Sequence, residues 1–326
     1  MEALTTTNQQ QITARIDQLI DRFLFEQDVK ANSRQVYRNN MKAFFAWVQS
    51  AGHNLSDLTR VQILDYKTYL LQSGKSTLTV AGYLGTVRIF FEWCEGHKLY
   101  PNIAKGVRAP RDKKAFRKNP ISFEQSIELM IHFNGKAGKS EAAARDSAVI
   151  HLLLVMGLRT IEVIRANIED ICFIDGRRVI MIQGKGWDEK NEAMELTNEA
   201  YEPIQRYLRM RGNPSRGPLF VSTSNNNRGQ RLTTHSISYM AKAGLRAIGI
   251  DDKSVTAHSL RHTAAHNILR GGEDIFKVQG MLRHADIKTT MRYTAGMNQE
   301  MRLKDSGEGF LSRLYTEAIR ERQTAA

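Results

Sequence analysis

The chain has 326 residues, 41% of them hydrophobic, and carries a formal net charge of +13 at pH 7. This is enough apolar material for two globular domains with cores of their own, and no apolar run approaches the ~20 residues of a membrane span. Residues 1–7 lack the basic and then apolar layout of a signal peptide, so the composition argues against an exported or membrane-spanning protein, whereas the basic excess indicates a polyanionic partner.

Helical periodicity dominates the first third of the chain. Residues 1–11 are expected to be a flexible N-terminus. The spacing of apolar residues then predicts four helices, at 12–25, 34–48, 61–71 and 78–93, the second of them capped by Asn32 or Ser33. Together these helices predict a compact all-α module that spans 12–108.

Basic residues on these helices are candidates for a side that faces DNA. The candidates are Arg34, Arg38, Lys42, Lys75 and Arg88. Charge on a helix is often only its solvated face, and the pattern does not choose among the five.

The two cysteines, Cys94 and Cys172, lie in separate apolar stretches without a partner spacing. A disulfide or zinc framework is therefore not supported. We interpret both as buried thiols in a reducing compartment.

Residues 109–120 form a basic segment bounded by prolines. It holds five basic residues against one acidic residue, and the basic ones are Arg111, Lys113, Lys114, Arg117 and Lys118. The segment predicts a linker between two domains that crosses a phosphate backbone. A solvated linker that only keeps the chain soluble is the alternative.

The remainder of the chain predicts an α-rich domain with a small antiparallel sheet. Ser122 and Gln125 are spaced as a capping box that opens a helix, and Gly157 is a plausible left-handed stop after a helix at 141–156. Alternation predicts strands at 178–183 and 192–196 around a turn at 184–191. Further helices are expected at 198–211, 234–248, 256–270 and 274–282.

A series of polar residues in this second part contains what is needed to attack a phosphodiester. The series is Arg159, Lys185, His258, Arg261, His284 and Tyr293. Two guanidinium groups can hold the non-bridging oxygens of one phosphate, a lysine and a histidine can move protons, and a phenol can act as the nucleophile. Glu162 follows Arg159 at a spacing that lets its carboxylate steady the guanidinium, and Arg261 is on the same helical face as His258.

The local strings around these residues, taken in order, closely resemble the tyrosine recombinase (phage integrase) family. The strings are Gly157-Leu158-Arg159, Gly184-Lys185-Gly186, His258-Ser259-Leu260-Arg261-His262, Leu282-Arg283-His284 and Met291-Arg292-Tyr293. The resemblance implies a helical, SAM-like core-binding domain at 12–108, a linker at 109–120, a catalytic domain at 121–300 and a C-terminal tail helix at 301–326. Because the chain begins almost at the core-binding domain, it is expected to resemble Xer-like or transposon-type members without an arm-binding domain.

The resemblance also implies a role for each residue of the series. Tyr293, nine residues after His284, is expected to attack the phosphate and form a 3′-phosphotyrosine, with His258 as the base that takes its proton and His284 as a hydrogen-bond donor to a phosphate oxygen. Lys185 is expected to be the general acid for the leaving 5′-oxygen. Lys190 is its nearest competitor, and Trp187-Asp188-Glu189 brings two acids where the family often has basic residues.

Two other patterns resemble known sites but do not meet their requirements. His258, His262 and His266 recur at four-residue steps, as zinc ligands on one helix can, but Arg261 beside them would repel a cation. Gly74-Lys75-Ser76 resembles the end of a phosphate-binding loop but lacks its earlier glycine. No metal and no other cofactor is expected.

The tail carries an apolar stripe after possible hinges at Gly307 and Gly309. The stripe is Phe310, Leu311, Leu314, Tyr315 and Ile319. Such a stripe must be buried somewhere. It is expected to dock in trans on a neighbouring subunit, with a cap on its own domain as the alternative.

The sequence thus predicts a cytoplasmic, nucleoid-associated site-specific DNA recombinase. The resemblance implies a homotetramer on two inverted-repeat DNA sites that acts through a Holliday junction, with a partner recombinase or an accessory DNA-bending protein as further candidate partners. A type IB topoisomerase and a catalytically inactive DNA-binding protein are the alternatives.

Overall fold

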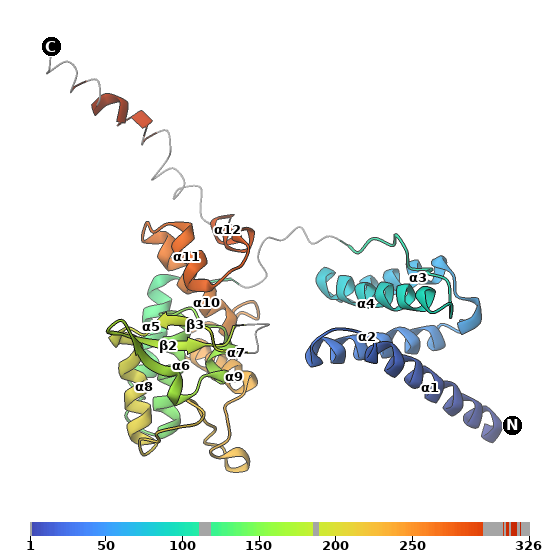
Figure 1. Ribbon diagram of the computed structural model, residues 1–326, viewed down its shortest axis with the longest axis horizontal. Helices are drawn as coiled ribbons and strands as arrows, with labels where there is room; N and C mark the ends of the chain where they lie inside the picture. Colours follow the sequence, from blue (N-terminus) through green and yellow to red (C-terminus); the bar gives the residue numbers. More distant parts are fainter. Residues whose placement is uncertain are drawn as a thin grey trace. The chain divides into compact units, whose positions relative to one another are not determined.

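The computed structural model describes residues 2–110, 119–184 and 189–295, with parts of 309–320, and it describes side chains from Ala14 to Met291 within those ranges and at some tail positions. The chain divides into two compact units, Met1–Lys113 and Lys114–Ala326 (Figure 1). The division falls inside the basic segment 109–120. Each unit is described below by itself.

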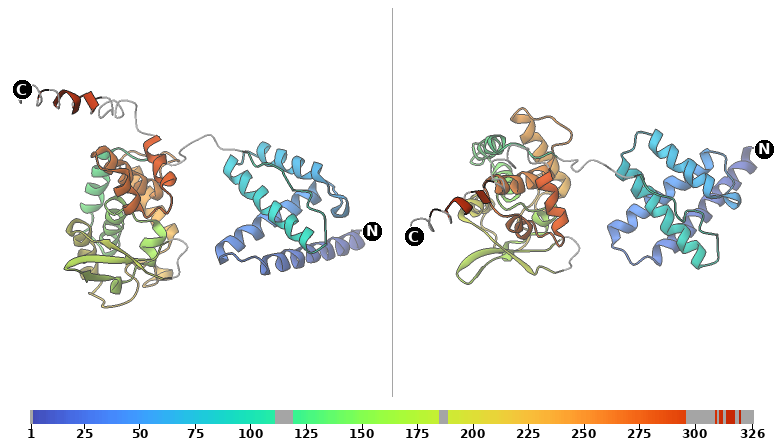
Figure 2. Two further views of the ribbon diagram at one scale, coloured as in Figure 1. Left: turned by 45° about the horizontal axis from the view of Figure 1, so that its top comes forward. Right: turned by 90° about the horizontal axis from the view of Figure 1, so that it is seen from above.

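The first unit is built from four α-helices around an aromatic core. The helices are α1 (Glu2–Phe25), α2 (Ala31–Ser50), α3 (Arg60–Gln72) and α4 (Thr77–Gly96), with a short 3₁₀ turn, η1, at Leu55–Asp57. α2 packs on α1 and on α4 (Figure 2). In the core, Phe23 and Phe90 meet edge to face with ring centroids 5.3 Å apart, and Phe44 and Tyr66 do so with ring centroids 5.0 Å apart. Edge-to-face aromatic pairs add to the apolar burial and stabilise this small domain.

Two helix starts in this unit differ from the sequence prediction. Residues 1–11 were expected to be a flexible N-terminus, but α1 begins at Glu2. The run is polar and so shows no apolar period, yet it contains no glycine or proline that would stop a helix. α2 begins at Ala31, and Lys30 occupies its N-cap without a side-chain hydrogen bond, so Asn32 and Ser33 lie inside the first turn rather than capping it.

The second unit is a helical domain that carries one small sheet. Its helices and strands are α5 (Phe123–Asn134), α6 (Glu141–Leu154), α7 (Thr160–Arg165), η2 (Ile168–Asp170), β1 (Ile171–Ile174), β2 (Arg177–Ile182), β3 (Glu192–Glu195), α8 (Asn198–Met210), η3 (Asn225–Asn227), α9 (Thr234–Ala247), α10 (Ala257–Arg270), α11 (Ile275–Leu282) and α12 (Ile287–Ala295).

α6 is the centre of this unit. It contacts α5, α8, α9 and α10, and its residues from Ser147 to Leu154 are all buried (Figure 1). A helix that is apolar all round is stable only where neighbours cover every face. The capping box predicted at Ser122 is confirmed, because Ser122 Oγ accepts from Gln125 N at 3.1 Å and Gln125 Oε1 accepts from Ser122 N at 2.9 Å.

The sheet is antiparallel, in the order β1-β2-β3, with Ile180 of β2 opposite Ile171 of β1 and Met194 of β3. The sequence predicted β2 and β3 but not β1, because a four-residue strand offers too little alternation. Cys94 is buried as expected, but Cys172 is half-buried, since it lies on β1 at the edge of the sheet. Within the described ranges, none of the helices is both long and apolar enough to span a bilayer.

Candidate active site

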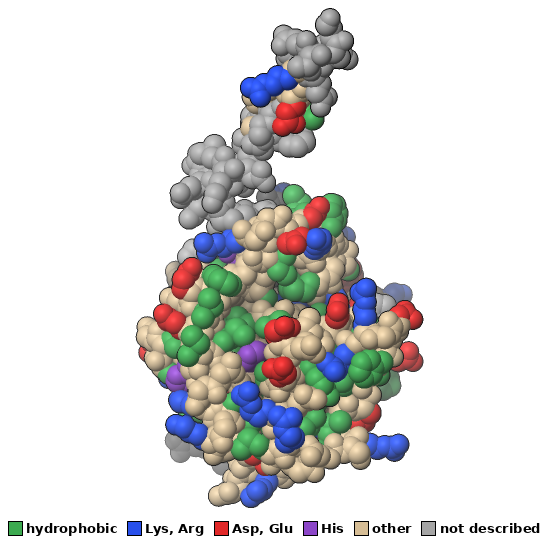
Figure 3. All heavy atoms as spheres, turned by 90° about the vertical axis from the view of Figure 1, so that its left-hand side faces the viewer, with side chains coloured by type: hydrophobic (Ala, Val, Ile, Leu, Met, Phe, Trp, Pro, Cys, Tyr) green, Lys and Arg blue, Asp and Glu red, His purple; other side chains and the backbone are tan. Residues whose placement is uncertain are grey.

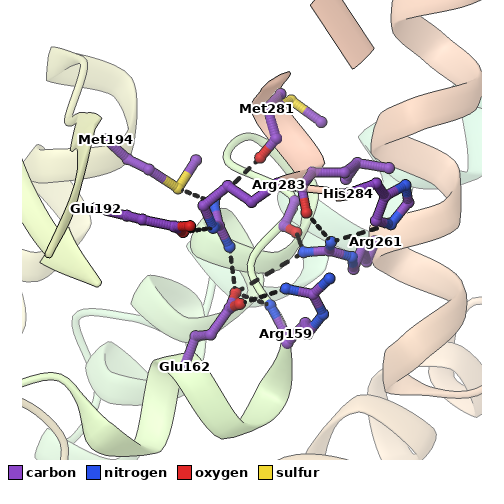
Figure 4. Close-up of polar contacts among 10 residues, drawn as sticks. Arg159, Glu162, Glu192, Met194, Arg261, Met281, Arg283 and His284 are labelled. Carbon is purple, nitrogen blue, oxygen red and sulfur yellow. Dashed lines mark hydrogen bonds and ion pairs between the residues drawn. The ribbon is translucent and has the colours of Figure 1, made fainter. Parts of the chain in front are cut away.

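Arg159 stands where the chain turns from α6 into α7. Gly157 adopts a left-handed conformation, with φ of 58°, and Arg159 then forms the N-cap of α7. Glu162, three residues on, accepts from the backbone N of Arg159 at 2.7 Å and from its guanidinium Nη1 at 2.7 Å (Figure 4). One carboxylate thus caps the helix and fixes the direction of the guanidinium.

Arg261 reaches the same place from the buried face of α10. Its side chain is 1% exposed. Nη1 donates to the carbonyl oxygen of Gly157 at 2.5 Å and lies 3.8 Å from Glu162 Oε2, while Nη2 donates to the carbonyl oxygen of Leu282 (Figure 4). The guanidinium therefore joins the turn after α6 to the end of α11.

His284 lies in the turn between α11 and α12. Its Nδ1 is 2.9 Å from the hydroxyl of the buried Thr290, and its Nε2 is 3.5 Å from Arg261 Nη2. Burial, followed by the positive charges of Arg261, Arg159 and Arg283, lowers the pKa of His284 to about 4. The ring is therefore neutral at pH 7, with one N–H to donate.

The rings of His258 and His262, one turn apart on α10, meet edge to face. Their ring centroids are 4.5 Å apart at an interplanar angle of 80°. His258 is exposed, whereas burial, then His258, Arg261 and His284, lower the pKa of His262 to about 3. Among the described residues, no three His, Cys, Asp or Glu side chains come together as metal ligands.

Glu162 is the carboxylate on which these groups converge. It is 1% exposed, and besides Arg159 and Arg261 it pairs with Arg283 (Figure 4). Burial alone would raise its pKa, but the charge of Arg283 and the hydrogen bonds from Arg159 and Arg283 outweigh burial, so its pKa is lowered. The sequence prediction assigned Glu162 to Arg159 only and gave Arg283 no role. The position of Arg283, a basic residue directly before His284 in the sequence, was the one signal that it could belong to the site.

Two residues of the predicted series are not placed by their side chains. Lys185 belongs to the range 185–188, which is outside the described residues. Tyr293 is within α12, but its side chain is not among those described. Lys190, the competitor of Lys185, forms an ion pair with the buried Asp170 at 2.5 Å. Lys190 is thus paired with the residue that directly precedes β1.

The candidates for DNA contact in the first unit have different partners. Arg38 pairs with Asp21 at 2.5 Å and Lys42 with Asp17 at 3.2 Å, so both are partly neutralised by α1. Arg34 donates to the carbonyl oxygen of Gln27 at 3.3 Å, the Lys75 amine lies 5.8 Å from the Tyr83 ring centroid, and Arg88 is exposed. The basic candidates Arg111, Lys113, Lys114, Arg117 and Lys118 lie outside the described residues.

One face of the second unit carries charges of both signs, with acidic and basic side chains interspersed (Figure 3). Of the predicted tail stripe, Leu311, Leu314 and Tyr315 are exposed, at 48%, 48% and 65%. Phe310 and Ile319 lie outside the described residues.

We expect the stability of the chain to fall as pH decreases from about 6.5 to 4. His284 and His262 bind protons more readily unfolded than folded, so stability is complete above the unfolded pKa near 6.5 and is lost as pH falls toward the folded values. Glu162 acts in the same direction below 4.5. Calorimetry of the full chain should show the decline, and His284→Gln should make it shallower. A wild-type unfolding temperature independent of pH in this window would contradict the buried neutral histidines.

We expect Gly157→Ala to lower the free energy of unfolding of the second unit. The residue has φ of 58°, and an added Cβ would lie 2.9 Å from Met281 Cε and 3.1 Å from Leu282 Cδ2. Left-handed strain alone costs roughly 1–2 kcal/mol. Gly176→Ala, also left-handed but with open space around the Cβ, is the matched control in urea unfolding, and equal losses in the two variants would disprove the crowding at Gly157.

Comparison with known proteins shows the family to which this fold belongs. Residues 122–300 match the model of the phage integrase family, and residues 16–97 match the phage integrase N-terminal SAM-like domain. The chain belongs to the phage integrase family of tyrosine recombinases.

Among curated relatives, the tyrosine recombinase XerD of Pseudomonas putida is 30% identical over 288 residues, which is 86% of this chain and 91% of the relative. XerD of Pseudomonas aeruginosa is 30% identical over 290 residues, with the same two coverages. Both relatives are therefore matched over nearly their whole length.

Solved structures show the same fold at lower identity. XerH site-specific recombinase bound to a palindromic difH substrate has a TM-score of 0.69 at 19% identity, covering 83% of this chain and 78% of that one. A lambda integrase tetramer bound to a Holliday junction has a TM-score of 0.66 at 16% identity, covering 88% and 82%.

Proposed function

We propose that this chain is a site-specific recombinase that breaks and rejoins duplex DNA through a covalent tyrosine intermediate. The observation that carries the proposal is the convergence of Arg159 and Arg261 on one buried carboxylate, Glu162, beside His284. Two guanidinium groups held in fixed directions suit the charge that develops on a phosphate under attack.

In the proposed reaction Tyr293 supplies the nucleophile. His258 takes the phenol proton, the phenolate oxygen attacks the phosphorus, and the bond to the 5′-oxygen breaks as Lys185 gives that oxygen a proton. The products are a 3′-phosphotyrosine and a free 5′-hydroxyl. Because the phosphodiester energy is kept in the new bond, a 5′-hydroxyl from another strand can reverse the step, and neither water nor a nucleotide is consumed.

Arg159 and Arg261 stabilise the pentacoordinate phosphate in this scheme. Glu162 accepts a hydrogen bond from Nη1 of Arg159, and the backbone oxygens of Gly157 and Leu282 accept from Nη1 and Nη2 of Arg261, so both guanidinium groups are held in fixed directions. His284 donates its one N–H to a phosphate oxygen when its tautomer places the proton on Nε2. That step requires Nδ1 to accept from the Thr290 hydroxyl, a pairing that the 2.9 Å contact allows.

The assembly that fits this chemistry is a homotetramer on two inverted-repeat DNA sites, with a Holliday junction between the two rounds of exchange. The relatives support it, since one of them is a tetramer on a Holliday junction. The exposed apolar residues Leu311 and Leu314 give the tail a surface to bury on a neighbouring subunit. A partner recombinase or a DNA-bending protein would act at this level.

Strand exchange between two copies of a binding site tests this function. The site is first selected from random duplex DNA by binding, and two copies are then placed on one supercoiled plasmid. We expect excised and joined circles, produced also in excess chelator, because the six residues supply nucleophile, acid, base and charge. Relaxed topoisomers without joined products would instead indicate a topoisomerase, and binding without a covalent adduct would indicate an inactive protein.

A further inference from the structure

Arg283 has a backbone conformation that favours glycine. It ends α11 with φ of 52° and ψ of 52°, one of four described non-glycine residues with positive φ. A side chain in this region is strained, and such strain persists where contacts hold the residue in place. We therefore expect the contacts of the Arg283 side chain to be what holds this residue in its strained conformation.

The guanidinium of Arg283 joins three segments of the second unit. Nη2 pairs with Glu162 Oε2 on α7, Nε lies 3.0 Å from Glu192 Oε2 on β3, and Nη1 donates to the carbonyl oxygen of Met281 on α11 at 3.1 Å (Figure 4). The side chain is 9% exposed. Two carboxylates thus share one buried guanidinium, and the second oxygen of Glu162 remains with Arg159.

Glu192 is the first residue of β3, directly after the connection from β2 that carries Lys185. Two residues near the β3 end of this connection, Lys190 and Glu192, form ion pairs. Lys190 pairs with Asp170 below β1, and Glu192 pairs with Arg283 beside His284. The first attachment stays within the sheet region, whereas the second ties the sheet to the arginine cluster.

We propose that Arg283 is a positioning residue that sets the start of β3 against Glu162 and Arg159. The inference rests on the proposed function, because it takes Lys185 to be the general acid. One arm of Arg283 acts on the arginine side of the site through Glu162. The other arm acts on the lysine side through Glu192.

The two arms can be separated by substitution. Arg283→Gly removes both arms while relieving the left-handed backbone, so the turn is retained. Glu192→Gln removes the charge of the β3 arm only. Arg246 lies on α9 and forms an exposed pair with Asp251, so Arg246→Ala is the matched control for loss of an arginine ion pair.

The measurement is the rate of covalent adduct formation on a nicked duplex that carries the selected site. Each variant is assayed on normal DNA and on DNA with sulfur in place of the bridging 5′-oxygen, a leaving group that needs little protonation. We expect Arg283→Gly to be about 100-fold slower on normal DNA, the effect typical of a misplaced catalytic group. Glu192→Gln should be slower by a smaller factor and return to the wild-type rate on the sulfur substrate.

Arg283→Gly should recover only in part on the sulfur substrate, since it also releases Glu162. Wild-type rates for Arg283→Gly on both substrates would overturn the proposal. Equal defects of Glu192→Gln on both substrates, or no defect on normal DNA, would overturn the β3 arm. If Arg283→Gly does not fold, Glu192→Gln alone decides, and failure of the wild-type chain to form any adduct would count against the proposed function itself.

Discussion

Replacing Tyr293 with phenylalanine should abolish covalent attachment to DNA and leave binding nearly unchanged. The substitution removes one oxygen, so no phosphotyrosine can form, and the loss of a nucleophile typically costs at least about 10⁴-fold in rate. DNA affinity should persist because it comes mainly from basic groups that contact phosphates. Gel shift gives the binding, and denaturing electrophoresis of the nicked-duplex reaction gives the adduct.

Tyr315→Phe is the matched control for this experiment. Tyr315 is 65% exposed in the tail and is the nearest tyrosine after Tyr293 in the sequence. It should form adduct like the wild type. An adduct that persists in Tyr293→Phe and disappears in Tyr315→Phe would move the nucleophile to the tail.

Glu162→Ala should cause the second largest loss, in stability as well as in reaction. The carboxylate is 1% exposed and pairs with Arg159, Arg283 and Arg261. Its removal leaves three guanidinium groups close together without a counter-charge, and breaking a buried pair costs about 3–5 kcal/mol. Adduct formation should fall with it, because Arg159 loses the hydrogen bond that directs it. Urea unfolding and the adduct assay measure the two effects.

Glu162→Gln separates charge from packing in the same assays. The amide keeps the volume and one acceptor oxygen, so we expect a smaller loss of stability than in Glu162→Ala. Glu273→Ala, which breaks an exposed pair with Lys277 on α11, is the surface control and should change stability little. An unchanged free energy of unfolding in Glu162→Ala would show that the arginine cluster does not depend on this carboxylate.

Local patterns were sufficient for most of the fold. Eight of the nine helices predicted with both ends are present within three residues of those ends, because apolar period and caps such as Ser122 are properties of the neighbouring residues. Short segments were missed for the same reason. α7 has only six residues and β1 only four, so both are too short for hydrophobic periodicity to identify them.

The candidate site could be proposed from the sequence as a set of residues but not as an arrangement. Arg159 and Arg261 could be chosen from the order of their motifs, and the Glu162 contact followed from a spacing of three. Arg283 meets Glu162 across 121 residues of sequence, and Glu192 joins them only through the path of β3. Contacts of this kind come from tertiary packing and have no local signature.

The most direct test of the proposed tyrosine chemistry is to identify the residue that is esterified to DNA. Wild-type chain is trapped on the nicked duplex, the DNA is trimmed with nuclease, and the modified peptide is sequenced by mass spectrometry. We expect a nucleotide on Tyr293, joined through the 3′-phosphate, with a free 5′-hydroxyl on the released strand. A nucleotide on any other residue, or a 5′-phosphate link to Tyr293, would contradict it.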